Sequence, residues 1–98
     1  MPERIITVGR DALLSEGIPP DRIPPGPVRI AVRYEPEEDG THAVGYYLQA
    51  ATEGGWRDIP IADNLDEAAG YIRALERAAH HADPNFRAWL AEWDAFID

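Results

Sequence analysis

The run Glu35-Pro36-Glu37-Glu38-Asp39 holds the densest group of chemically active side chains in the sequence, four carboxylates within five residues. Carboxylate oxygens are the ligands that calcium and other hard cations prefer. However, the spacing of an EF-hand loop is absent, and predicted strands rather than helices flank the run. We therefore interpret it as a solvated hairpin loop, and the alternative function for Glu35, Glu37, Glu38 and Asp39 is docking on a basic partner.

Near the C-terminus, aromatic residues recur at three- and four-residue spacing and share one side of a predicted helix. They are Phe86, Trp89 and Trp93. Two interpretations stay open, because a small domain needs such apolar area for its own core and Trp is also enriched at interface hot spots. Substitution of Trp89 by Ala separates them, through loss of folding in the first case and loss of partner binding in the second.

The remaining candidates for catalysis lack suitable neighbours. His80 and His81 are adjacent on a predicted helix and point about 100° apart, so they do not converge on one metal ion. Ser15 lies outside any nucleophile-elbow pattern, and Gly54-Gly55 fits a turn without the lysine of a phosphate-binding loop. We predict that the protein is not an enzyme and binds no metal or cofactor.

A basic and aromatic group is predicted on one side of the sheet. Arg29 and Arg33 share a strand face, and Tyr47 and Gln49 lie beside them on the neighbouring strand. Such a face can bind an anion or stack nucleic-acid bases. We favour the simpler interpretation, in which nearby carboxylates pair with the arginines or the C-terminal helix covers them.

Composition limits the class of partner. Eighteen acidic residues face nine basic ones, all arginine, and the net charge is -9 over 98 residues. Proteins that neutralise phosphates carry the opposite surplus, so we do not expect nucleic acid as a partner. The acidity either keeps the protein soluble or directs it to a basic partner protein.

The length fits one domain, and a hydrophobic share of 45% is ordinary for a globular protein. There is no cysteine, which favours a reducing compartment. The first residues lack the apolar segment of a signal peptide, and no run of about 18 apolar residues exists. We expect a cytoplasmic protein that does not interact with membranes.

The elements that position these residues form an α+β fold. We divide the chain into an N-terminal segment, 1–27, with a proline-rich arm, and a single α+β domain, 28–98. The arm, residues 19–27, contains five of the nine prolines and is predicted to be an extended connector. Residues 5–8 favour a short strand, and residues 10–16 a helical turn or two that ends at Gly17.

Alternating apolar residues predict strands over 28–34 and 44–51, and a third strand starts near Trp56 and is limited by Pro60. Helical periodicity follows from Asn64, a predicted N-cap, and Asp83-Pro84 begins a second helix. The apolar stripe of the first helix comprises Leu65, Ala68, Ala69, Ile72, Leu75 and Ala79. We predict a three-stranded antiparallel meander, four-stranded if residues 4–8 join it, packed against one main helix, plus a C-terminal aromatic-rich helix.

The strands followed by a helix that opens Asn64-Leu65-Asp66-Glu67-Ala68 resemble the HicB-like antitoxins, in which a sheet precedes a helix starting near a T-x-E-E-A run. The resemblance covers about residues 28–80, and Asn64 stands where that family usually has Thr. It implies a small protein that neutralises another protein.

We therefore expect a non-enzymatic protein-binding protein of inhibitor, antitoxin, immunity or nucleic-acid-mimic type, docked on a basic partner. One alternative is an accessory subunit or homodimer assembled through the C-terminal helix. A second is a small-ligand-binding protein or an enzyme without a recognisable motif.

Overall fold

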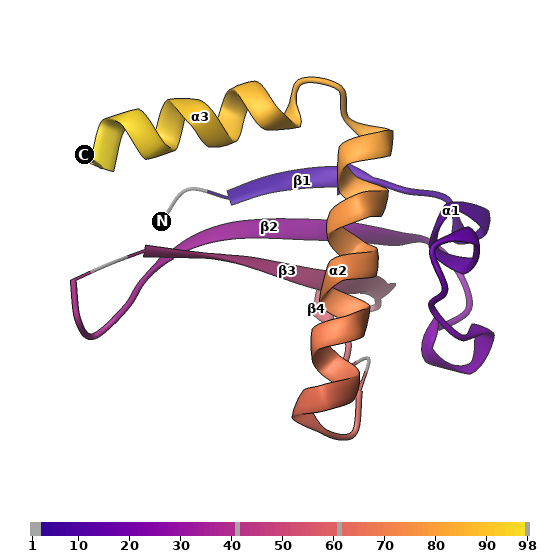
Figure 1. Cartoon of the computed structure of the whole chain (residues 1–98). Helices are drawn as coiled ribbons and strands as arrows, with labels where there is room; N and C mark the ends of the chain where they lie inside the picture. Colours follow the sequence, from indigo (N-terminus) through magenta and orange to yellow (C-terminus); the bar gives the residue numbers. More distant parts are fainter. Residues whose placement is uncertain (1–2, 41, 61, 98) are drawn as a thin grey trace.

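The computed structural model describes residues 3–40, 42–60 and 62–97, with side chains for all of these except 36, 42 and 93–97. In chain order the elements are β1 (Glu3–Thr7), α1 (Arg10–Ser15), the 3-10 turn η1 (Pro20–Arg22), β2 (Val28–Pro36), β3 (His42–Thr52), β4 (Gly55–Asp58), α2 (Leu65–Ala82) and α3 (Phe86–Ile97). Figure 1 shows the strands as one sheet with α2 crossing its face.

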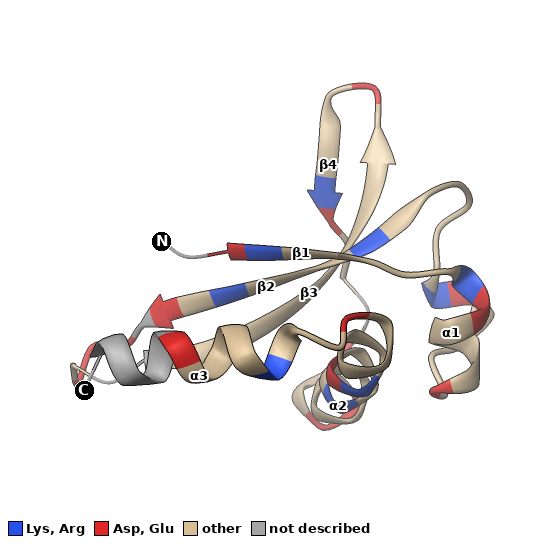
Figure 2. Ribbon diagram, turned by 90° about the horizontal axis from the view of Figure 1, so that it is seen from above, with Lys and Arg blue, Asp and Glu red and all other residues tan. Residues whose placement is uncertain are grey.

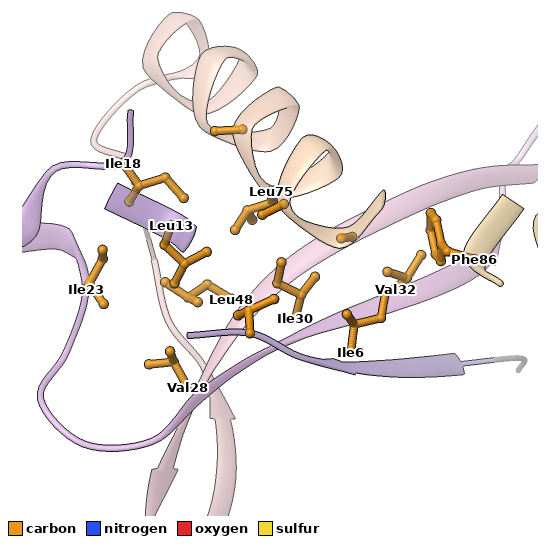
Figure 3. Close-up of a cluster of buried hydrophobic side chains, with 14 residues drawn as sticks. Ile6, Leu13, Ile18, Ile23, Val28, Ile30, Val32, Leu48, Leu75 and Phe86 are labelled. Carbon is orange, nitrogen blue, oxygen red and sulfur yellow. The ribbon is translucent and has the colours of Figure 1, made fainter. Parts of the chain in front are cut away.

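The sheet is an antiparallel meander in the order β1-β2-β3-β4. This confirms the predicted α+β fold in its four-stranded form, because β1 pairs with β2 from Glu3 opposite Arg33 to Thr7 opposite Arg29. The period-two pattern also holds in β2, where Ile30 and Val32 are completely buried. Their side chains and that of Leu48, opposite Ile30 on β3, form the centre of the core (Figure 3).

Helix α2 begins where the sequence predicts. The side chain of Asn64 accepts a hydrogen bond from the backbone N–H of Glu67 at 2.8 Å, the N-cap interaction. The predicted apolar stripe is buried only in the second half of the helix, where Leu75 is 0% exposed, whereas Leu65 is 88% exposed. The reason is geometric, because α2 crosses the sheet and its first half extends past it (Figure 1).

The N-terminal segment contributes directly to the core. Leu13 of α1 and Ile18 and Ile23 after it are buried against the same cluster as β2 and α2 (Figure 3). Arg10 donates hydrogen bonds to the carbonyls of Ile23 and Pro24, which holds the proline-rich stretch against α1. Residues 19–27 thus contain a 3-10 turn and a core side chain, although their proline content predicts an extended connector.

The described helices all lie on one side of the sheet, and none of them covers its other face, which we call the open face (Figure 2). The open face comprises alternate residues of the four strands, and the β3–β4 hairpin bends away from the helices. Within the described part of the chain, no helix combines the length and apolarity needed to cross a bilayer.

Candidate functional site

The open face of the sheet is organised around Arg33. Its Nε donates to Glu3 of β1 at 2.7 Å, and its two terminal nitrogens donate to the carboxylate of Asp58 of β4 at 2.9 and 3.1 Å. One guanidinium of β2 therefore joins both edge strands. Hydrogen bonds from Arg33 and then from Gln49 hold the pKa of Asp58 below its usual value, against an opposing effect of burial.

Tyr47 is sandwiched within this network. Its hydroxyl donates to Glu35 at 2.8 Å, and the guanidinium carbon of Arg33 lies 4.5 Å from the centre of its ring. The ring also lies against the backbone of Gly45, where a Cβ atom would stand 2.7 Å from Tyr47 Cε2. The hydrogen bond to Glu35, reinforced by burial, raises the pKa of Tyr47.

Gln49 connects the two halves of the face. Although it is only 5% exposed, its Oε1 accepts from Arg29 Nε at 2.8 Å and its Nε2 donates to Asp58 at 2.8 Å. Arg29 in turn lies 4.2 Å from the ring centre of Trp56. The network thus supplies hydrogen bonds to the side-chain amide of Gln49, whose burial without partners would cost free energy.

The structure shows whether Arg29 and Arg33 are paired within the sheet or covered by a helix, the two interpretations favoured from the sequence. Arg33 is paired with the carboxylates of Asp58 and Glu3, as favoured, whereas Arg29 donates to the neutral side-chain amide of Gln49. The helices lie on the opposite face and do not cover them. All three guanidinium nitrogens of Arg33 donate within the network, so an anion or a nucleic-acid base would have to displace these contacts before it reached Arg33.

The acidic run lies where the sequence predicts, in the β2–β3 hairpin. Glu35 is partly buried at the end of β2, and Glu37, Glu38 and Asp39 are exposed in the turn. Gly40 closes the turn with a φ of 87° and donates its N–H to the carbonyl of Glu37 at 3.1 Å. The hairpin lies at the same end of the molecule as the C-terminal end of α3 (Figure 1). Among the described residues, no group of three His, Asp or Glu residues is placed to hold a metal ion.

The aromatic residues of α3 do not share one environment. Phe86 is 0% exposed, and its ring centre lies 4.8 Å from that of His80 and 6.1 Å from that of Tyr46. Trp89 stacks on Phe86 at 6.0 Å and, like Leu90, is only partly buried at the margin of the core. The side chain of Trp93 lies outside the described residues. Phe86 is thus a core residue, and a partner can reach Trp89 but not Phe86.

Elsewhere too the arginines are held within the chain. Arg4 pairs with Asp83 at 2.6 Å, Arg22 with Asp63 at 2.6 Å, and Arg77 with Glu16 at 2.8 Å. With Arg10, Arg29 and Arg33, six of the nine arginines have partners in the described part of the chain. By contrast, Glu37 and Glu38 have no cation against them among the described residues.

An apolar groove lies between the first half of α2 and the sheet, beyond the end of β4. Its volume is about 220 Å³, and its lining consists of Tyr46, Tyr47, Leu48, Ile59, Pro60, Ala62, Ala68 and Ile72. Sequence reasoning missed this groove, because it places Ala68 and Ile72 in the core-facing stripe. Pro60 was the available sequence signal, because a proline prevents the last strand, which ends at Asp58, from continuing beside the longer β3.

A larger hollow of about 560 Å³ lies at the junction of α2 and α3, with His80, His81, Arg77, Arg87 and Asp83 among its lining residues. Within this hollow the carboxylate of Asp83 accepts a hydrogen bond from Arg4, and this hydrogen bond lowers the pKa of Asp83. A carboxylate kept ionised in this way is poorly suited to act as a general acid.

Comparison with protein families, curated proteins and solved structures finds no match to this chain. What the protein does is therefore inferred from the surfaces described above.

Proposed function

We propose that this is a small acidic protein that binds a basic partner protein and performs no chemistry of its own. The observation that carries the proposal is the division of charge over the molecule. Four of the nine arginines are ion-paired with carboxylates in the described part of the chain and two more donate to neutral acceptors, while Glu37 and Glu38 are exposed in the β2–β3 hairpin. The charge offered to a partner is therefore predominantly that of carboxylates.

A net charge of -9 on 98 residues attracts a basic partner over distances near the Debye length. Complementary charge of this kind raises the association rate and the specificity more than the final affinity. It also repels nucleic acid and anionic lipid, which fits a protein partner. Inhibitors, antitoxins and immunity proteins are the functional types that this description suits.

The test is capture from a nuclease-treated native lysate by the tagged full chain, followed by washes of low and high salt and mass spectrometry. We expect basic proteins that leave at high salt. The double variant Glu37→Gln/Glu38→Gln is expected to retain much less of them than the unaltered protein. Its matched control is Glu53→Gln/Asp11→Asn, which removes the same amount of charge at exposed positions away from the hairpin.

Capture that resists salt, or that falls equally in both double variants, would contradict a docking role for the hairpin. The second candidate function would then gain weight, namely assembly through α3. The observation that favours it is the partial burial of Trp89 and Leu90 at the edge of the core. In that case sedimentation should show a mass that rises with protein concentration and changes little with salt.

A further inference from the structure

One long edge of the sheet is unpaired. Every residue of β3 from His42 to Ala50 pairs with β2, but β4 pairs only with residues 49–52. After β4, the N–H of Ile59 donates to the carbonyl of Leu48 at 2.8 Å and the pairing stops. In the described part of the chain, residues 43–47 are thus paired on one side only, and we call them the free edge of β3.

The direction of the backbone groups on this edge follows from the antiparallel alternation. Residues of such a strand point their N–H and C=O groups alternately to one neighbour and to the other. The carbonyl of Leu48 points toward the β4 side, where it accepts from Ile59, and the N–H of Ala51 points toward β2, where it donates to the carbonyl of Pro27. Val44 and Tyr46 therefore direct their N–H and C=O groups outward along the free edge.

Among the described residues, this edge has none of the features that usually protect an edge strand. Proteins guard edge strands with charged residues, prolines, bulges or covering segments. Residues 43–47 read Ala-Val-Gly-Tyr-Tyr, without charge or proline, and their register with β2 contains no bulge. Figure 1 shows no helix or strand drawn beside β3 on this side between the β2–β3 hairpin and α2.

The apolar groove lies next to the free edge on the helix side of the sheet. It is lined by Tyr46 and Leu48 of β3, by Ile59 and Pro60 after β4, and by Ala68 and Ile72 of α2. Ile72 is 41% exposed there. A strand laid along β3 would continue the line of β4, and every second side chain would point to the groove. The volume of about 220 Å³ suits one or two aliphatic side chains.

The charges beside the edge select the partner. Glu35 lies on the open face, hydrogen bonded to Tyr47, and Glu37 and Glu38 lie in the turn at the end of the strand. On the helix side Glu76 is near Tyr46, where it adds to the effect of burial in raising the pKa of Tyr46 to about 12. A second copy of this chain, which also has a net charge of -9, would meet repulsion on both faces, whereas a basic segment would be attracted.

We propose that an extended, basic segment of the partner protein adds to the sheet as a strand along the free edge of β3, an inference that rests on the proposed function. The backbone groups of Val44 and Tyr46 supply the hydrogen bonds, the groove receives alternate apolar side chains, and the surrounding carboxylates bind intervening Lys or Arg residues. Main-chain pairing of this kind gives affinity, and the pockets for alternate side chains give specificity.

The probe is a display library of random ten-residue peptides, selected on the purified full chain. We expect enrichment of sequences in which aliphatic or aromatic residues alternate with Lys or Arg. An enriched peptide should slow hydrogen exchange at the amides of Val44 and Tyr46, as measured by NMR. In an added strand, alternate peptide N–H groups point toward β3 and away from it. Methylation of the peptide nitrogens that point toward β3 should weaken binding about tenfold or more, and methylation of the others should weaken it little.

Substitutions in the groove provide the matched comparison. Ala68→Arg fills the groove and repels a basic peptide, whereas Ala69→Arg places the same charge on an exposed neighbour that does not line it. We expect the first variant to lose at least about tenfold in affinity and the second to lose much less. Thermal unfolding of both variants verifies that they are folded, and the N-methyl comparison stands without any variant.

The outcomes separate this inference from the proposed function. One outcome is that basic proteins are captured and released by salt, but the amides of Val44 and Tyr46 exchange at unchanged rates and the Ala68→Arg and Ala69→Arg variants bind with equal affinity. In that case strand addition is wrong and the proposed function stands. If no basic peptide is enriched and capture is insensitive to salt, both are wrong. A dimer in which these two amides are protected without peptide would overturn the inference in favour of a second copy of the chain.

Discussion

At the scale of single residues, the open face shows how one glycine makes room for a network. Gly45 has no side chain, so the ring of Tyr47 can lie against the backbone of the strand. In this position the Tyr47 hydroxyl donates to Glu35, and the guanidinium of Arg33 lies over the ring. Arg33 in turn joins β1 to β4. The guanidinium of Arg33 and the ring of Tyr47 are thus engaged by partners within the chain, and for this reason we do not assign this face to nucleic acid.

Substitution of Gly45 by Ala tests this arrangement. The new Cβ would stand 2.7 Å from Tyr47 Cε2 and 2.8 Å from its hydroxyl oxygen, so the ring must move away. Loss of the hydrogen bond to Glu35 and of the cation–π contact should lower the free energy of unfolding by about 1 kcal/mol, after the small gain that Ala brings. Urea denaturation measures the change.

The control is Gly54→Ala, whose Cβ would meet no atom within 4 Å and which should leave stability nearly unchanged. In a Tyr47→Ala background the cost of Gly45→Ala should disappear, because the clashing ring is gone. A cost that persists in that background would show that the Tyr47 ring is not the reason.

At the scale of elements, α2 shows the limits of periodicity. Six apolar positions recur at helical spacing, but α2 lies over the sheet only in its second half, so the position along the helix decides which ones are buried. Leu75 is 0% exposed and Leu65 is 88% exposed, although both belong to the same predicted stripe. The unburied half lines the groove instead of the core.

The same substitution at these two positions gives a sharp comparison. Leu75→Ala removes a fully buried side chain and should destabilise the protein by about 3 kcal/mol. Leu65→Ala removes an exposed side chain and should change stability by less than about 0.5 kcal/mol. Equal effects in chemical denaturation would mean that α2 packs on the sheet along its whole length.

The ion pair of Arg4 with Asp83 joins β1 to the junction of α2 and α3, and it predicts a dependence on pH. The pair lowers the pKa of Asp83 in the folded protein. Its stabilisation is therefore fully present above the unfolded value of about 3.9 and is lost as the pH falls through the lower folded value. The thermal unfolding temperature of the unaltered protein should therefore fall more steeply below about pH 4 than that of the Asp83→Asn variant. The control Asp11→Asn, at an exposed position, should keep the full dependence.

At the scale of the whole molecule, the N-terminal segment and the sheet form one core. Five buried side chains of that segment, Ile6, Val8, Leu13, Ile18 and Ile23, belong to the same cluster as Leu48 and Leu75 (Figure 3). The strand β1 also supplies Glu3 to the Arg33 network.

Deletion of residues 1–27 tests this unity. Each buried aliphatic side chain contributes about 2 kcal/mol, and the total stability of a small domain is about 5–15 kcal/mol. We expect the shortened chain to lose cooperative thermal unfolding and the dispersed amide signals of a folded protein. A shortened chain that unfolds cooperatively would show that residues 28–98 suffice for folding.

The sequence by itself determined the fold class, the meander, the Asn64 cap and the acidic hairpin, because these depend on local periodicity, turn chemistry and capping. It also excluded a charge surplus suited to nucleic acid. Only the tertiary structure decided which arginines are paired, which half of α2 is buried, that Phe86 is a core residue, and that β3 outruns β4 to leave a free edge beside a groove. These properties depend on how far elements overlap in space, and residues distant in the sequence, such as Arg33 and Asp58 or Arg4 and Asp83, meet only once the strands and helices have packed.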